Sequence, residues 1–162
     1  MKRKEESGFP ELESRLAEKA GITTHLNKIL AAYYLYTHKM RNFYWTVEGQ
    51  DCFDLRGNFR KLHTSGFRHM DEIAERIRLF NQVPVRMLNN LLKVSEIKED
   101  RDQLTSFEMV KSAVRDITIL ISLQSDCSEK ARELGDHGTE AMMKMLIKEL
   151  EMDYILFRSW LK

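Results

Sequence analysis

The hydrophobic residues of this 162-residue chain recur at three- and four-residue steps almost throughout, which is the spacing of amphipathic helices. The sequence lacks the alternation of apolar and polar residues that is typical of half-buried strands. Four long helices are predicted, over residues 23–47, 53–80, 105–135 and 139–160. A short amphipathic helix is predicted over residues 86–94, in the long connection between the second and third. The pattern predicts an all-α four-helix bundle in which this connection allows the second and third helices to run parallel.

Two regions follow from this pattern. Residues 1–21 are predicted to form a loose N-terminal arm, with at most a short turn over residues 11–20, and residues 22–162 are predicted to form the bundle. The apolar content of 43% is enough for one hydrophobic core in a chain of this length. The sequence contains neither a linker-like run of Gly, Ser and Pro nor an internal repeat, so one folded domain is expected.

Five residues are predicted to shape the helix ends and the helix contacts. Thr23 or Thr24 is expected to cap the first long helix and Thr139 the last, because a hydroxyl at this position accepts a hydrogen bond from a free backbone N–H. Gly57 and Gly66 lie inside the second predicted helix, where each costs up to about 1 kcal/mol relative to alanine. A close approach of another backbone segment is the explanation that we expect for these glycines.

The predicted helix over residues 53–80 carries a charged stripe, which consists of Arg56 and Arg60 near its start and Asp71 and Glu75 near its end. At about 100° per residue, all four side chains fall within a sector of roughly 100°. An identical helix laid antiparallel would bring the two arginines opposite the two acids of its partner. The charged stripe is therefore self-complementary, and such a pattern indicates a two-fold partner.

The midpoint of the charged stripe falls near Ser65 and Gly66. A two-fold axis at this point would lie close to Phe67 and His63. The alternative is an ordinary solvated helix face, on which exposed ion pairs contribute only about 0–1 kcal/mol each.

The formal net charge is +1, from 26 basic and 25 acidic side chains. This balance gives no attraction of the whole molecule to nucleic acid. Only Lys2, Arg3 and Lys4 are locally basic, and Glu5 and Glu6 follow them directly. Repetition of these cations in an assembly would raise their avidity for DNA, whereas salt would weaken the contact steeply. DNA is therefore predicted to be a weak partner at most.

The two cysteines, Cys52 and Cys127, match no zinc-binding spacing and are predicted to be free thiols in a reducing compartment. No apolar run that could serve as a secretory signal follows the charged N-terminus, and no apolar run is long enough to span a bilayer. We expect a cytoplasmic protein with no membrane contact.

Several short blocks resemble the Dps family, the starvation-induced miniferritins of the ferritin-like superfamily. They are residues 70–77, with Asp-Glu-Ile-Ala-Glu-Arg as the most specific block, residues 41–45 (Arg-Asn-Phe-Tyr-Trp), 53–55 (Phe-Asp-Leu), 94–97 (Val-Ser-Glu-Ile) and 135–139 (Gly-Asp-His-Gly-Thr). The resemblance implies a dodecameric hollow shell of four-helix subunits. In this family ferrous iron is oxidised between two-fold-related subunits, often by hydrogen peroxide, and ferric mineral is stored inside. Many members also bind DNA, usually through basic termini.

The sequence departs from the family at the metal site. The family's ligands are two histidines and an aspartate from one subunit, and an aspartate and a glutamate from its neighbour. By the resemblance, Tyr44 and Arg56 replace the histidines, Arg60 replaces the first aspartate, and only Asp71 and Glu75 remain. Arginine offers no lone pair to a metal and stays charged. We infer that Arg56 and Arg60 pair with the acids of a partner subunit where relatives bind iron.

Asp136 resembles an acidic position at the three-fold pores through which family shells admit iron, and Glu140 is expected to contribute to it. The acid that the family often has before its Met-Leu step is Ala141 in this chain. The alternative for Asp136 is a local role, because a helix N-terminus attracts acids through its dipole.

The leading hypothesis is a Dps-like shell subunit, for intracellular iron storage and protection against oxidative stress, that has lost the usual ferroxidase site. One alternative is an active ferroxidase with a relocated metal site that uses His63, Asp71 or Glu75. The other is a structural shell that compacts DNA. The resemblance implies a homo-oligomer, a dodecamer, as the assembly, and iron as the metal that it handles.

Overall fold

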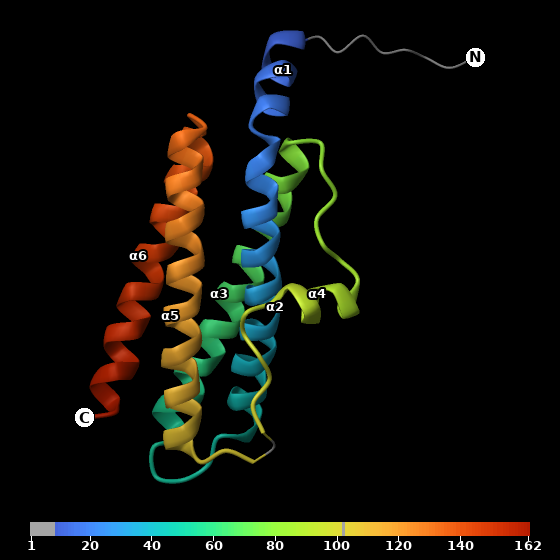
Figure 1. Cartoon of the computed structure of the whole chain (residues 1–162). Coiled ribbons are helices and arrows are strands. Elements are labelled where there is room, and N and C mark those ends of the chain that lie inside the picture. Colours follow the sequence, from blue (N-terminus) through green and yellow to red (C-terminus); the bar gives the residue numbers. More distant parts are fainter. Residues whose placement is uncertain (1–8, 102) are drawn as a thin grey trace.

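The computed structural model describes residues 9–101 and 103–162 and forms a bundle of helices (Figure 1). The four long helices are α2 (Thr23–Thr46), α3 (Cys52–Leu79), α5 (Ser106–Glu133) and α6 (His137–Trp160). The short helix α4 (Leu88–Val94) lies in the connection between α3 and α5, and α1 (Pro10–Glu18) precedes the bundle. The predicted all-α bundle with a short helix in its long connection is confirmed.

The connection that contains α4 allows α3 and α5 to run in the same direction, whereas α2 and α6 run in the opposite one (Figure 1). Helix α2 packs along α3, α5 packs along α6, and α2 also contacts α5. Each long helix contributes fully buried apolar side chains to one core, among them Tyr33, Phe59, Ile117 and Leu146. This arrangement leaves the other face of α3 open to solvent.

Helices α5 and α6 each begin with a side-chain cap. Helix α5 begins with a capping box, in which Thr105 accepts a hydrogen bond from the Glu108 N–H and Glu108 accepts one from the Thr105 N–H. At α6 the predicted cap, Thr139, is wrong. Asp136 is the cap, and its carboxylate accepts a hydrogen bond from the Thr139 N–H. The helix starts two residues earlier than predicted, because a carboxylate serves as a cap as well as a hydroxyl does.

The start of α2 also differs from the prediction, because neither threonine caps it. The Thr23 hydroxyl instead donates a hydrogen bond to the Ala20 carbonyl. A 3-10 turn (Ala20–Ile22) leads straight into α2, so the chain is already helical before Thr23. Within residues 9–21 of the arm, helix α1 occupies Pro10–Glu18, where at most a short turn was expected. Proline at its first position and acids in its first turn favour this local helix, although none of its residues is buried.

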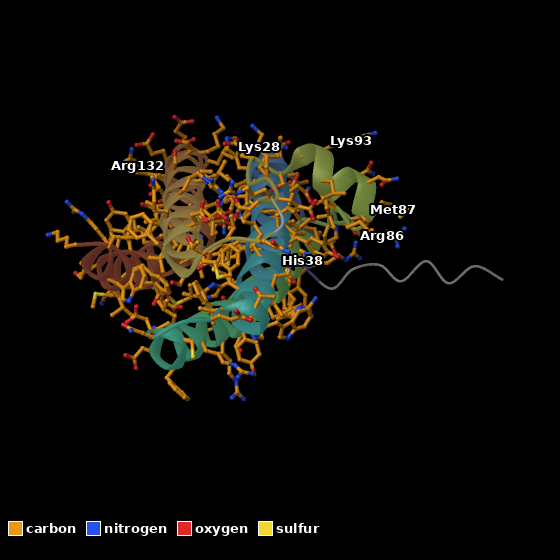
Figure 2. All side chains as sticks on the ribbon, turned by 90° about the horizontal axis from the view of Figure 1, so that it is seen from below. Lys28, His38, Arg86, Met87, Lys93 and Arg132 are labelled. Carbon is orange, nitrogen blue, oxygen red and sulfur yellow. The ribbon has the colours of Figure 1, made fainter. Side chains whose placement is uncertain are left out.

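Several contacts hold the connection against the bundle. Leu91 of α4 is buried, whereas Arg86, Met87 and Lys93 project from this segment away from the bundle (Figure 2). Further along, the connection is held by the buried Lys39 of α2. Its ammonium group donates a hydrogen bond of 3.1 Å to the Lys98 carbonyl, lies 3.0 Å from Asp100 and also pairs with Asp116 of α5.

The two glycines inside α3 differ in their surroundings. A Cβ atom at Gly66 would overlap the Thr37 hydroxyl group, so α2 does approach closely there, but through a side chain and not, as expected, through its backbone. A Cβ atom at Gly57 would have no atom of the described chain within 4 Å, so contact within the subunit does not explain that glycine. The close approach at Gly66 presses the middle of α3 against α2.

Replacing Gly66 by alanine is therefore expected to lower the free energy of unfolding by about 1–3 kcal/mol, because the added methyl group overlaps Thr37. The matched change Gly57→Ala is expected to raise it by up to about 1 kcal/mol, because alanine favours helix and meets open space. Adding Thr37→Ala should recover most of the loss at Gly66. Equilibrium denaturation of the four proteins measures both effects. Equal stabilisation by the two glycine changes would contradict the close approach.

Candidate functional site

The charged stripe lies on the solvent face of α3. Arg56, Arg60, Asp71 and Glu75 are all exposed, whereas the apolar side chains on the opposite side of this helix are buried. Asp71, the stripe acid nearest to Arg60 in the sequence, lies about 16 Å further along the helix. Within residues 9–101 and 103–162, neither acid forms an ion pair. The two halves of the stripe therefore cannot neutralise each other within one subunit.

Two arginines, Arg56 of the stripe and Arg41 of α2, lie against aromatic rings. The Arg56 guanidinium lies 5.1 Å from the centre of the Tyr44 ring. The Arg41 guanidinium lies 5.2 Å from the Trp45 ring and 5.7 Å from the Phe67 ring. Together with His63, which connects Tyr44 to Phe67, these residues form what we call the arginine–aromatic cluster. Contacts between cations and ring faces of this kind fix the orientation of both groups.

His63 lies inside the arginine–aromatic cluster. Its ring centre is 5.6 Å from that of Tyr44 and 6.2 Å from that of Phe67. Burial lowers the pKa of His63, and the nearby positive charges of Arg41 and Arg60 lower it further. His63 is therefore neutral at pH 7 and adds no charge to the arginines around it. Its Nδ1 atom is buried without a hydrogen-bond partner in the subunit.

A groove of about 760 Å³ runs between α3 and α6 beside the stripe. Its walls include three cations of α3, which are Arg60, Lys61 and Arg68. Lys61 pairs with Asp153 of α6 at 2.8 Å, and Arg68 pairs with Glu149 of α6 at 2.8 Å. Arg60 forms no ion pair with any described residue, so it is the cation of this groove that remains available to a partner.

Asp136 and Glu140, the two expected pore residues, lie at the start of α6. Asp136 is 3% exposed and pairs with Arg76 of α3 at 2.5 Å. Arg76 also donates a hydrogen bond to the Thr139 hydroxyl and packs against Gly138, where a Cβ atom would lie 2.7 Å from Nη2. Glu140 pairs with Lys144. This geometry agrees with the alternative role of Asp136 at the start of a helix. The pair of Arg76 and Asp136 also joins residues 70–77 to residues 135–139, which are two of the blocks that carry the resemblance.

Burial would raise the pKa of Asp136, but hydrogen bonds from Thr139 and the charge of Arg76 outweigh it and hold this pKa below its usual value. The folded state thus gains stability above the unfolded pKa of about 3.9 and loses it as the pH falls through the folded pKa. Asp136→Asn keeps the cap but removes the charge, so it is expected to cost about 1–3 kcal/mol at pH 7. Denaturation from pH 7 to pH 3 should show this difference narrowing below about pH 4. A difference that is constant with pH would contradict the charged pair.

Comparison with known proteins identifies the family. A family model for the ferritin-like domain matches residues 23–162. The DNA protection during starvation protein 2 of Bacillus anthracis is 31% identical over 136 residues, which are 84% of this chain and 93% of that protein. This chain belongs to the Dps family. An uncharacterised protein of Haemophilus influenzae is 28% identical over 142 residues, which cover 88% of this chain and 89% of that one.

The structure of a Dps protein from Vibrio cholerae O1 superposes on this Dps chain with a TM-score of 0.87. The two sequences are 31% identical, and the match covers 91% of this chain and 92% of the other. The Vibrio protein is described as a member of a superfamily of ferritin-like diiron-carboxylate proteins. Within one subunit of the present Dps chain, the described residues contain no group of three or more His, Cys, Asp or Glu side chains that could hold a metal ion.

The structure thus brings some of the expected site residues together and leaves others apart. Tyr44, Arg56, His63 and Phe67 form one cluster, to which Arg60 is adjacent. Arg41 and Trp45 were not expected there, although their spacing of four residues places them on one face of a helix.

Lys2, Arg3 and Lys4, the residues predicted to contact DNA, lie outside the described residues. No helix of the described chain is both long and apolar enough to cross a membrane.

Proposed function

We propose that this chain forms the shell of a Dps-type miniferritin, a homo-dodecamer of the cytoplasm, and that its usual ferroxidase site has been replaced by arginine–carboxylate pairs. The function would be to hold iron and to limit oxidative stress without rapid oxidation of ferrous ions at the two-fold contacts. The observation that carries the proposal is the presence of Tyr44, Arg56 and Arg60 at three positions where the family resemblance predicts metal ligands.

The chemistry of these side chains argues against a metal at this position. A ferrous ion needs lone pairs from carboxylates, imidazoles or water. Arg56 and Arg60 offer only N–H donors and permanent positive charge. The remaining acids, Asp71 and Glu75, are exposed and without an ion pair in their own subunit, so they are available to the partner's guanidinium groups. Arginine and carboxylate form forked, charge-assisted hydrogen bonds, which fix orientation as well as attraction.

The expected role of these pairs is to set the register of two subunits rather than to add much stability. Removing both ions from water costs free energy that offsets much of their attraction. A pairing of this kind still discriminates between partners, because like charges placed opposite each other are strongly unfavourable.

Ferrous oxidation is the experiment that tests this proposal. The assembled protein is expected to oxidise ferrous iron no faster than the buffer does, with either oxygen or hydrogen peroxide, because the two-fold site lacks its ligands. The measurement is the rise in ferric absorbance together with the iron retained per shell after gel filtration. A Dps protein with an intact ligand set serves as the positive control. Rapid oxidation by this chain would favour the relocated site, which would use His63, Asp71 or Glu75.

The DNA-compacting alternative has a separate test. Several curated relatives are named as DNA protection proteins, among them those of Bacillus anthracis and Brevibacillus brevis. We expect weak DNA retardation that disappears at moderate salt, because Lys2, Arg3 and Lys4 make few phosphate contacts per subunit. Retardation that persists at moderate salt would support this alternative instead.

A further inference from the structure

We propose that Phe67 is the central contact between two copies of this chain, and that it packs against the partner subunit's Phe67 beside the two-fold axis. This inference rests on the proposed function, in which the arginines of one subunit face the acids of the other. It adds an apolar centre to that charged contact and names a second copy of the same chain as the occupant of the exposed face of α3.

The positions of the charges fix where the centre of such a contact must lie. When two α3 helices run antiparallel, Arg56 faces the partner subunit's Glu75 and Arg60 faces the partner subunit's Asp71. Both pairs share one midpoint, between Ser65 and Gly66. Phe67 then lies only about 2 Å from the axis along the helix, so the two copies of this ring are separated by about 4–5 Å in that direction. Offset aromatic pairs prefer ring centres 4.5–7 Å apart.

The side chain of Phe67 is exposed enough to make such a contact. It is 43% exposed, although it lies in the middle of a helix whose opposite face is fully buried. Arg41 and His63 contact its ring from within the subunit, at 5.7 Å and 6.2 Å respectively. The ring is therefore oriented by its own subunit on one side and open on the other. Nearby, Trp45 is 61% exposed and extends the apolar part of this surface.

The backbone behind Phe67 lies close against α2. The neighbouring Gly66 is in contact with Thr37 of α2, at the level of the proposed axis. A helix that is pressed against its neighbour at this point cannot bend inward when a second copy docks. The centre of the surface is thus preformed, which lowers the cost of association.

Charge complementarity favours a second copy over nucleic acid as the occupant. The arginine–aromatic cluster alone would suit the bases and phosphates of a single strand. Asp71 and Glu75 lie on the same face of the helix, however, and would repel phosphates. An antiparallel second copy is complementary to both halves of the stripe at once, and it brings the two open rings together at the centre.

Disulfide trapping in the full chain tests this arrangement. Cys52 is first replaced by serine, because it is the partly exposed native thiol, while Cys127 is buried. Phe67→Cys is then expected to form a disulfide with its own copy under mild oxidation, since Cα atoms 4.4–6.8 Å apart can be bridged. Arg60→Cys mixed with Asp71→Cys, after unfolding and refolding together, should give a disulfide between the two variants. The control is Phe107→Cys on α5, whose native ring is 50% exposed; it should stay reduced.

The outcomes separate this inference from the proposed function. Assembled Phe67→Cys that stays reduced, or a mixture that links no more than either variant alone, would overturn the inference even if ferrous oxidation is absent. Trapping of both disulfides together with rapid ferrous oxidation would uphold the contact and overturn the proposed function. As a second measurement, Phe67→Ala should weaken pairing roughly thirtyfold on dilution, as the loss of a central aromatic contact does, whereas Phe107→Ala should not. Equal affinities of the Phe67→Ala protein and the wild type would contradict the central contact.

Discussion

Reversal of a single charge, Arg60→Glu, is expected to weaken the proposed two-fold contact by at least roughly a hundredfold. The substitution would place a glutamate opposite the partner subunit's Asp71, twice in each pair of subunits. It would also remove a groove cation that forms no ion pair with any described residue. Analytical ultracentrifugation over a dilution series measures the loss of assembly. Arg132→Glu on α5 makes the same change in net charge away from the stripe and should leave assembly intact.

A double-mutant cycle identifies the partner of Arg60. Asp71→Arg alone is also expected to weaken the contact, because it would face a second arginine. Arg60→Glu combined with Asp71→Arg restores opposite charges, so assembly should return in large part. Residues in direct contact show such coupling, whereas independent sites give additive effects. Additive losses in the double variant would count against the pairing of these two residues.

Restoring the family's ligands is expected to produce faster iron oxidation than the wild type gives. The triple variant Tyr44→His, Arg56→His, Arg60→Asp would offer two imidazoles and a carboxylate beside the partner subunit's Asp71 and Glu75. These are ligands that iron accepts, and the repelling guanidinium groups are gone. Ferrous oxidation by hydrogen peroxide should rise at least about tenfold, which corresponds to about 1.4 kcal/mol in the barrier.

The matched control for that variant is Tyr44→Phe, Arg56→Gln, Arg60→Gln. It removes the same cations and the same hydroxyl but supplies neither imidazole nor carboxylate. We expect it to bind and oxidise no more iron than the wild type. Equal activation of the two triple variants would mean that loss of positive charge, rather than the restored ligand set, governs oxidation.

The bundle and the charged stripe could be predicted from the sequence because both depend on helical periodicity alone. The apolar spacing gave four long helices, and 100° per residue gave the common face of Arg56 and Glu75. The caps at Thr23 and Thr139 were wrong, because a cap depends on the backbone just before the helix, and periodicity contains no information about that turn.

The sequence pattern does not predict which side chains of different helices are in contact. Arg41 and Trp45 belong to the arginine–aromatic cluster because of how α2 is rotated against α3, and the pattern of one helix does not fix that rotation. The sequence indicates a close approach at Gly66 only in general terms, and the structure identifies the Thr37 side chain as its neighbour. The pairing of Arg76 with Asp136 likewise joins two segments that the sequence leaves far apart.

The most direct test of the central claim is a crystal structure of the assembled protein after a soak in ferrous iron, with anomalous diffraction collected at the iron edge. We predict that the guanidinium groups of Arg56 and Arg60 lie within hydrogen-bonding distance of the partner subunit's Asp71 and Glu75, and that no iron peak appears between the two subunits. An iron peak held there by Asp71 or Glu75, with both arginines turned away into solvent, would contradict this account.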